Sequence, residues 1–131
     1  MRAVLDPNVL ISALLVREGA PAQILVQWLA GEFEVVVSEL LLAELGRALG
    51  YPRLRKRIPA ADAKLFLALV RNSGIVVTDP EAIPRSPDPG DDYLLALAER
   101  ERAVLVSGDR HLLGLADVFP VYSPREFLRL L

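Results

Sequence analysis

The sequence lacks cysteine, and its 131 residues include one histidine and one tryptophan. The absence of cysteine excludes disulfide bonds and thiolate metal sites. Because His111 is the only histidine, catalysis by a histidine pair is excluded too. No apolar run approaches the roughly 18 residues of a membrane span, and Asp6 and Asn8 interrupt the apolar N-terminal stretch that a signal peptide would need. We therefore expect a cytoplasmic protein that does not bind membranes.

The residues that are present fit one compact domain spanning 1–131. Hydrophobic residues make up 53% of the chain, which is enough for a substantial core. The formal net charge is −2, so no overall basic field favours nucleic acid. The sequence contains no glycine-rich phosphate loop, which argues against a nucleotide-binding ATPase.

Short β-branched segments alternate with helical segments along the chain. The expected strands are 2–5, 33–37, 75–78, 103–107 and 118–122, and the expected helices are 9–16, 22–30, 39–49, 62–72, 91–102, a short one after 109 and one from 124 onward. This alternation predicts an α/β fold with a parallel sheet covered on both faces. The basic run 53–57 is expected in a connector, and the proline-rich segment 79–89 in an irregular loop.

Two acids directly follow expected strands. Asp6 follows the first strand and Asp109 the fourth, so both are expected at the carboxyl edge of the sheet, where open α/β sheets bind ligands. Each acid could instead only cap the helix behind it, and Pro7 suits the first position of such a helix. Two acids at one edge favour a cation site over capping alone.

Further acids lie on or at the start of expected helices. On a helical wheel, Leu40 and Ala48 lie about 40° either side of Glu44, which places this carboxylate within an apolar stripe. The alternative is a glutamate at the border of the stripe with its charge in solvent. Asp91 and Asp92 open another helix, where one acid suits the dipole and two exceed what capping needs.

A cluster of carboxylates without cysteine has a chemical interpretation. Hard oxygen ligands suit Mg²⁺ or Mn²⁺. Such ions suit phosphodiester hydrolysis, because they activate water and stabilise the charge that develops on phosphorus.

Four stretches in this order resemble the motifs of PIN domains, and most closely those of the VapC-like toxins of toxin–antitoxin systems. They are LDPNVLISAL (5–14), LLLAEL (40–45), DPGDDYLLALA (88–98) and VSGDRHLL (106–113). The resemblance spans the whole chain. Two positions depart from the family pattern: Pro7 stands where the family usually has Thr or Ser, and His111 replaces a common acid.

The resemblance implies a three-layer α/β/α sandwich with a five-stranded parallel sheet. It also implies a Mg²⁺- or Mn²⁺-dependent endoribonuclease that hydrolyses RNA with a metal-activated water. The implied catalytic and metal-binding acids are Asp6, Glu44, Asp92 and Asp109, with Asn8 and Ser107 as supporting polar residues and Asp91 as an extra ligand through water. Asp92 is preferred over Asp91 because the family's third acid directly precedes a stretch such as 93–96.

The implied partners are an RNA substrate, a cognate antitoxin protein and a second copy of the chain. Removing four carboxylates from a net charge of −2 leaves +2, so a metal-loaded site stops repelling a phosphate backbone. The basic run then becomes a candidate RNA contact through Arg53, Arg55, Lys56 and Arg57, although the residues of the run alone slightly favour a solvated connector. Apolar surplus in the helices 22–30 and 62–72 favours a homodimer.

Two other functions compete with a ribonuclease. The first is a non-catalytic PIN-like module that binds RNA or protein, which the presence of all four acids disfavours. The second is a metal-dependent phosphatase on a doubly wound sheet. A phosphatase of the haloacid-dehalogenase type would need an aspartate where Asn8 stands. Cleavage of RNA compared with cleavage of p-nitrophenyl phosphate distinguishes these functions.

Overall fold

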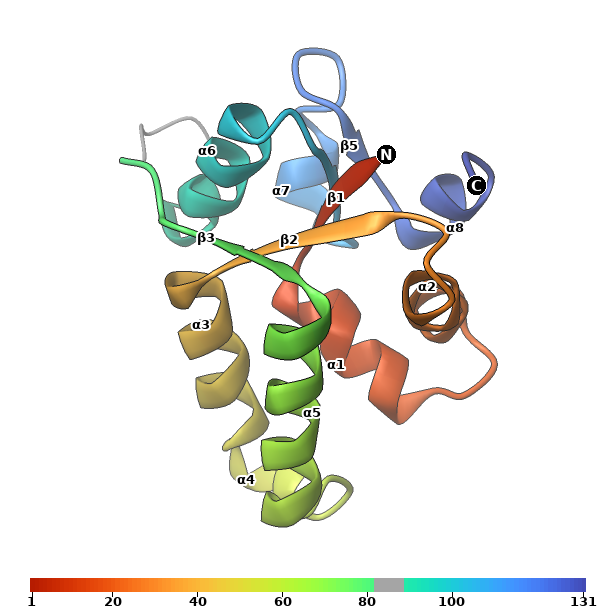
Figure 1. The fold of residues 1–131 in the computed structure, drawn as a ribbon, viewed down its shortest axis with the longest axis vertical. Helices are drawn as coiled ribbons and strands as arrows, with labels where there is room; N and C mark the ends of the chain where they lie inside the picture. Colours follow the sequence, from red (N-terminus) through yellow and green to blue (C-terminus); the bar gives the residue numbers. More distant parts are fainter. Residues whose placement is uncertain (82–88) are drawn as a thin grey trace.

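The computed structural model describes residues 1–81 and 89–131, and its centre is a five-stranded parallel sheet (Figure 1). The strands are β1 (Arg2–Leu5), β2 (Glu34–Ser38), β3 (Ile75–Val77), β4 (Val104–Val106) and β5 (Val121–Tyr122). Their order is β3-β2-β1-β4-β5, and every neighbouring pair is parallel. The first strand therefore lies in the middle of the sheet, with β4 directly beside it.

Helices cover both faces of this sheet. They are α1 (Pro7–Leu15), α2 (Ala20–Leu29), α3 (Glu39–Leu49), α4 (Pro52–Arg55), α5 (Ala60–Ser73), α6 (Asp92–Arg100), α7 (Arg110–Leu113) and α8 (Pro124–Leu128), with a 3₁₀ turn η1 at Pro89–Asp91. In Figure 1, α1, α3 and α5 lie on one side of the sheet and α6 lies on the other. The fold is a three-layer α/β/α sandwich, as the sequence predicts.

The strands are apolar because both of their faces are covered. Ala3, Val4 and Leu5 are consecutive and all buried, although successive side chains of a strand point to opposite faces. The same pattern recurs at 35–37 in β2, so the middle of the sheet forms the core. The register of the central strands pairs Leu5 at the end of β1 with Val106 at the end of β4, so the residues that follow the two strands lie side by side.

Two elements differ from the sequence-based expectation. Part of the basic run 53–57, expected in a connector, forms the short helix α4, because Pro52 suits a first helical position and Leu54 packs against the core. Helix α2 begins at Ala20 rather than at 22, since Pro21 is tolerated in the first turn. Most of the expected loop 79–89, residues 82–88, lies outside the described residues.

No single helix in the described part of the chain has the length and apolar composition to cross a membrane. Among the described helices, the pair α1 and α2 has that length and composition when taken together, but the two helices are bent by 100° relative to each other.

Candidate active site at the carboxyl ends of the strands

The ends of β1 and β4 bring Asp6, Ser107 and Asp109 together, and we call these three residues the strand-end group. The backbone N–H of Asp6 donates to the carbonyl oxygen of Val106 at 3.0 Å, which extends the pairing of β1 with β4 by one residue. The hydroxyl of Ser107 donates to Asp6 Oδ2 at 2.7 Å, and the backbone N–H of Asp109 donates to Ser107 Oγ at 3.0 Å. The serine hydroxyl therefore links the two acids.

Both acids of the strand-end group also cap helices. The backbone N–H of Asn8 donates to Asp6 Oδ1 at 3.0 Å at the start of α1. At the start of α7, Asp109 Oδ1 accepts from the N–H of His111 at 2.7 Å and from that of Leu112 at 3.4 Å. Each acid therefore caps a helix and also lies next to the other acid, because each helix begins where its strand ends.

Asp6 is only 4% exposed, and its ionisation is correspondingly perturbed. Burial raises the pKa of the Asp6 carboxyl above its ordinary value, and the nearby charge of Asp109 raises it further. The hydrogen bonds from Asn8 and Ser107 oppose this rise without cancelling it. A buried carboxylate beside a second carboxylate is a place where a cation lowers the free energy.

Glu44 lies at the border of the buried face of α3 and not within it, contrary to the interpretation of the sequence. The buried residues of this helix are Leu41, Leu42, Leu45 and Leu49, and on the helical wheel Glu44 lies roughly 115° from the centre of that face. Its side chain is 36% exposed and pairs with the guanidinium of Arg47. The helical-wheel prediction is wrong because it counted Leu40 as part of the buried stripe, whereas Leu40 is 41% exposed.

Tyr93, in the first turn of α6, lies near several of the acids. Burial raises the pKa of its hydroxyl most, and negative charges raise it further. Four carboxylates are close enough to have this effect: Asp6, Glu44, Asp91 and Asp79. We call Glu44, Asp79, Asp91 and Tyr93 the helix group. It lies near the strand-end group, because the charge of Asp6 also acts on the Tyr93 hydroxyl.

Asp91 and Asp92 occupy different environments at the start of α6. Asp92 is 4% exposed, whereas Asp91 is half-buried. Of these two neighbouring acids, Asp91 is the one whose charge acts on the Tyr93 hydroxyl. The choice of Asp92 as the third acid of the site therefore stays a prediction, and Asp91 is a direct competitor for that role.

Sequence reasoning missed Asp79 and Tyr93. Asp79 Oδ2 accepts from the N–H of Leu40 at 3.0 Å at the start of α3, while its Oδ1 is buried without a hydrogen bond to any residue that the structure describes. A usable signal was present, because Asp79 closely follows the strand β3 as Asp6 follows β1. Tyr93 carried no comparable signal, since an aromatic residue in an amphipathic helix is usually part of the core.

The carboxylates fit Mg²⁺ or Mn²⁺ by chemistry, since all are hard oxygen donors. Within residues 1–81 and 89–131, no three Asp, Glu or His side chains converge as a metal-binding cluster. This spacing is compatible with Mg²⁺, which keeps several waters and is commonly bound through one or two carboxylates. Asp6 and Asp109 are two such donors that share Ser107 as a hydrogen-bond partner.

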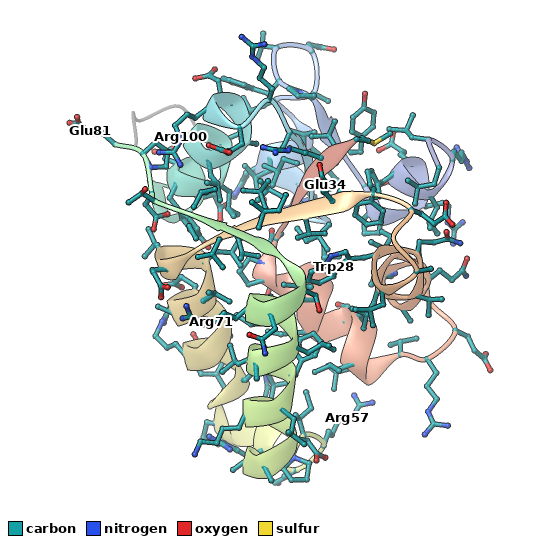
Figure 2. All side chains as sticks on the ribbon, viewed as in Figure 1. Trp28, Glu34, Arg57, Arg71, Glu81 and Arg100 are labelled. Atoms are coloured by element: carbon teal, nitrogen blue, oxygen red, sulfur yellow. The ribbon has the colours of Figure 1, made fainter. Side chains whose placement is uncertain are left out.

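The expected RNA contacts lie apart from these acids. Arg53, Arg55, Lys56 and Arg57 are all exposed, and they lie in or just after α4, at the end of α3 that is remote from the sheet (Figure 1). Arg57, labelled in Figure 2, donates to the carbonyl oxygen of Leu15 at 3.2 Å and so ties this segment to α1. Arg57 therefore has a hydrogen bond within the protein in addition to its predicted role in RNA binding.

The family model of the PIN domain matches residues 2–111. The chain therefore belongs to the PIN domain family, whose members are generally nucleases. This confirms the resemblance drawn from the four sequence stretches.

The chain is also similar to individual proteins. The chain is 28% identical to the uncharacterized protein MJ1680 of Methanocaldococcus jannaschii, over 98% of this chain and 90% of that protein. The fold matches PAE2754 from Pyrobaculum aerophilum with a TM-score of 0.68 and 21% identity, covering 99% of this chain and 88% of that one. It also matches a chain in the crystal structure of VapBC2 from Rickettsia felis bound to a DNA fragment from their promoter, with a TM-score of 0.64 and 14% identity, covering 94% and 98% of the two chains.

Proposed function

We propose that this protein is a Mg²⁺- or Mn²⁺-dependent endoribonuclease. The observation that carries the proposal is the strand-end group, in which a buried Asp6 shares the hydroxyl of Ser107 with Asp109 at the edge where parallel α/β sheets bind ligands. Membership of the PIN domain family supports a nuclease. The substrate class and the metal are our inference.

Asp6 and Asp109 would hold the ion, and Glu44 and Asp92 belong to the same proposed set of metal-binding and catalytic acids. A bound divalent ion supplies an activated water and compensates the charge on the phosphate. Ser107 orients Asp6 by donating to Oδ2, and Asn8 fixes Oδ1 through its backbone N–H. With both oxygens held, the carboxylate has one defined orientation before any ion binds.

Hydrolysis by water predicts a particular set of products. The water oxygen bonds to phosphorus, the bond from phosphorus to the 3′ oxygen breaks, and that oxygen takes up a proton. The products carry a 5′-phosphate and a 3′-hydroxyl, whereas attack by the ribose 2′-hydroxyl would leave a cyclic phosphate. The described residues contain one histidine, so the histidine pair that 2′-hydroxyl attack commonly uses is not available.

The test is cleavage of a single-stranded RNA with Mn²⁺ and with EDTA, followed by end-group analysis. We expect cleavage in Mn²⁺ but not in EDTA, and we expect the cleaved RNA to carry 5′-phosphate ends. Cyclic phosphate ends, or equal cleavage in EDTA, would contradict the mechanism. Hydrolysis of p-nitrophenyl phosphate without cleavage of RNA would identify a phosphatase, and binding of RNA without cleavage would identify a non-catalytic module.

We further propose that the basic run contributes to RNA binding through Arg53, Arg55 and Lys56, with Arg57 nearer to α1. Arg55→Ala should weaken binding of single-stranded RNA a few-fold. It should also reduce the slope of the logarithm of the binding constant against the logarithm of the salt concentration by about one unit, as expected for one lost phosphate contact. Arg129→Ala, an exposed arginine just past the end of α8, is the matched control. Equal effects of the two substitutions would show that only overall charge matters.

A toxin of a toxin–antitoxin pair acting in the cytoplasm is the biological role that we propose. It would bind a cognate antitoxin, as the similarity of its fold to VapBC2 suggests. A homodimer is supported by exposed apolar side chains on α2 (Val26 and Leu29) and on α5 (Leu65 and Leu69). An upstream gene for a small DNA-binding protein would support the antitoxin. The mass of the protein in solution tests the homodimer.

A further inference from the structure

A cleft of about 320 Å³ opens beside the strand-end group. Its walls come from α1, α2, α8 and the loop between β4 and α7, and Figure 1 shows α2 beside α1 and α8. The residues that matter for its chemistry are Asn8, Ser12, Pro21, Gly108, Asp109 and Pro124. Because Asp109 also belongs to the strand-end group, anything bound in the cleft lies next to the proposed reaction site.

The polar groups of the cleft suit a neutral ligand with hydrogen-bonding edges. Asn8 and Ser12 are one helical turn apart on α1 and so share a face of that helix. Neither side chain donates or accepts a hydrogen bond with any residue in the described ranges, so both are available to a ligand. Of the described lining residues only Asp109 is charged, which disfavours an anionic group in the cleft itself.

The remaining walls suit a flat ring. Pro21 and Pro124 come from two different helices and present rigid apolar surfaces. The volume is at the lower end of the range for small-molecule pockets, so it fits one ring system better than a whole nucleotide. Apolar faces together with a hydrogen-bonding edge are what an extruded nucleobase requires.

We propose that this cleft binds one unpaired nucleobase adjacent to the scissile phosphate of a single-stranded RNA. This inference rests on the proposed ribonuclease function and adds a subsite to it. Asn8 and Ser12 contact the edge of the base, while Pro21 and Pro124 contact its faces. A base within a duplex cannot enter, because its edge is paired and its faces are stacked.

Abasic substitution of the substrate tests this subsite. A cleavable single-stranded RNA is prepared with one abasic ribose placed in turn at each position around the cleaved bond. We expect cleavage by the wild-type protein to fall about tenfold at one flanking position, since an abasic ribose cannot make the hydrogen bonds that the base makes to Asn8 and Ser12. The variant Ser12→Phe, which fills the cleft, should cleave the intact and abasic RNAs at one equal, reduced rate.

Two controls separate the cleft from general damage. Ser73→Phe, at the end of α5, adds the same ring at an exposed serine and should retain the wild-type sensitivity to the abasic position. If Ser12→Phe fails to fold, Ser12→Ala, which removes the hydroxyl and adds no atom, should show an intermediate sensitivity to the abasic position. Equal cleavage by the wild type of every abasic RNA and the intact RNA would overturn the subsite while leaving the ribonuclease intact.

A binding measurement keeps the subsite testable if no RNA is cleaved. The metal-free protein is titrated with each of the four uncharged ribonucleosides, because its carboxylates would repel a phosphate group, and backbone amide shifts are followed by NMR. We expect saturable shifts at Ser12 and Gly108 that Ser12→Phe abolishes. No shift with any of the four ribonucleosides would overturn the subsite, whereas absence of RNA cleavage in the presence of Mn²⁺ would count against the proposed function and not against the subsite.

Discussion

The strand-end group and the helix group hold their carboxylates in different ways. Asp6 and Asp109 follow neighbouring strands, so the hydrogen bonds of the sheet determine their separation, and Ser107 links them directly. In the helix group, by contrast, Glu44 lies in the middle of α3 and Asp91 precedes α6, while Asp79 follows the edge strand β3, which is not adjacent to β1. Acids that follow adjacent parallel strands are positioned by the backbone, whereas acids on helices depend on how each helix packs.

The helix group is held by contacts that cross between elements. Asp79 ties the segment after β3 to the start of α3 through the N–H of Leu40. Arg100 of α6, labelled in Figure 2, donates to the carbonyl oxygen of Thr78 and so ties α6 to the same segment. Glu44 itself is paired with Arg47. These side-chain contacts let the acids of the helix group shift in position more than the hydrogen bonds of the sheet let Asp6 and Asp109 shift. Four measurements test whether the two groups differ in function as they do in structure.

The largest difference should appear in catalysis. Asp6→Asn should reduce cleavage of RNA by on the order of 100-fold or more, because it changes the charge of a proposed metal ligand that already has one fixed orientation. Glu44→Gln should reduce cleavage by only about tenfold, since the Glu44 side chain is already neutralised by Arg47. Initial rates at saturating Mn²⁺ give both values. A larger loss for Glu44→Gln than for Asp6→Asn would invert the comparison.

The link between the two acids is tested by removing its hydroxyl. Ser107→Ala leaves Asp6 Oδ2 and the N–H of Asp109 without their partner, and should lower activity about tenfold and stability by about 1–3 kcal/mol. Ser38→Ala is the matched control, because Ser38 is equally buried and caps α3 through the N–H of Leu41. It should cost about 1 kcal/mol of stability and leave activity within about twofold. Denaturant unfolding and initial rates measure the two effects, and equal loss of activity would show that only stability matters.

The same difference explains what the sequence could predict. The strands at 2–5 and 103–107 are short and apolar, so the acids behind them could be assigned to one edge of the sheet, and Asp6 and Asp109 do meet there. Glu44 was placed within the buried face of its helix because the wheel treats all leucines alike, and only the tertiary packing shows that Leu40 is exposed. The sequence shows that Asp79 closely follows a strand, but its position relative to Asp6 depends on the sheet order, since β3 is separated from β1 by β2. The short helix α4 needed the anchoring of Leu54 against the core.

A smaller effect is expected on thermal stability. The folded-state pKa of Asp6 is raised above its ordinary value of 3.8, so the ionised carboxylate lowers the stability of the metal-free fold at neutral pH. This cost disappears as the pH falls through the folded-state pKa, and below the ordinary value the carboxyl is protonated in both states. Asp6→Asn should therefore raise the Tm at pH 7 by about 4 °C for each kcal/mol relieved, and the difference should close toward pH 3.8.

Thermal unfolding in EDTA and in Mg²⁺ provides both the measurement and its control. Mg²⁺ should raise the Tm of the wild type and leave that of Asp6→Asn nearly unchanged, since the ion compensates the charge that the substitution removes. A metal-free Asp6→Asn protein that melts at or below the wild-type temperature would show that its charge does not destabilise the fold.

The smallest effect concerns the ion pair of the helix group. Arg47 donates to Glu44 and, at 3.1 Å, to the hydroxyl of Tyr51, so it holds Glu44 along α3. Arg47→Gln should free this carboxylate and raise the affinity for Mn²⁺ about two- to threefold, a small gain because exposed ion pairs contribute little. Arg71→Gln changes the net charge equally, but it breaks the pair of Arg71 with Glu39, an exposed acid in the first turn of α3 (Figure 2). Calorimetric titration with Mn²⁺ should separate the two variants. An equal gain in both would mean that net charge alone sets the affinity, and Glu44 would then have no part in the metal site.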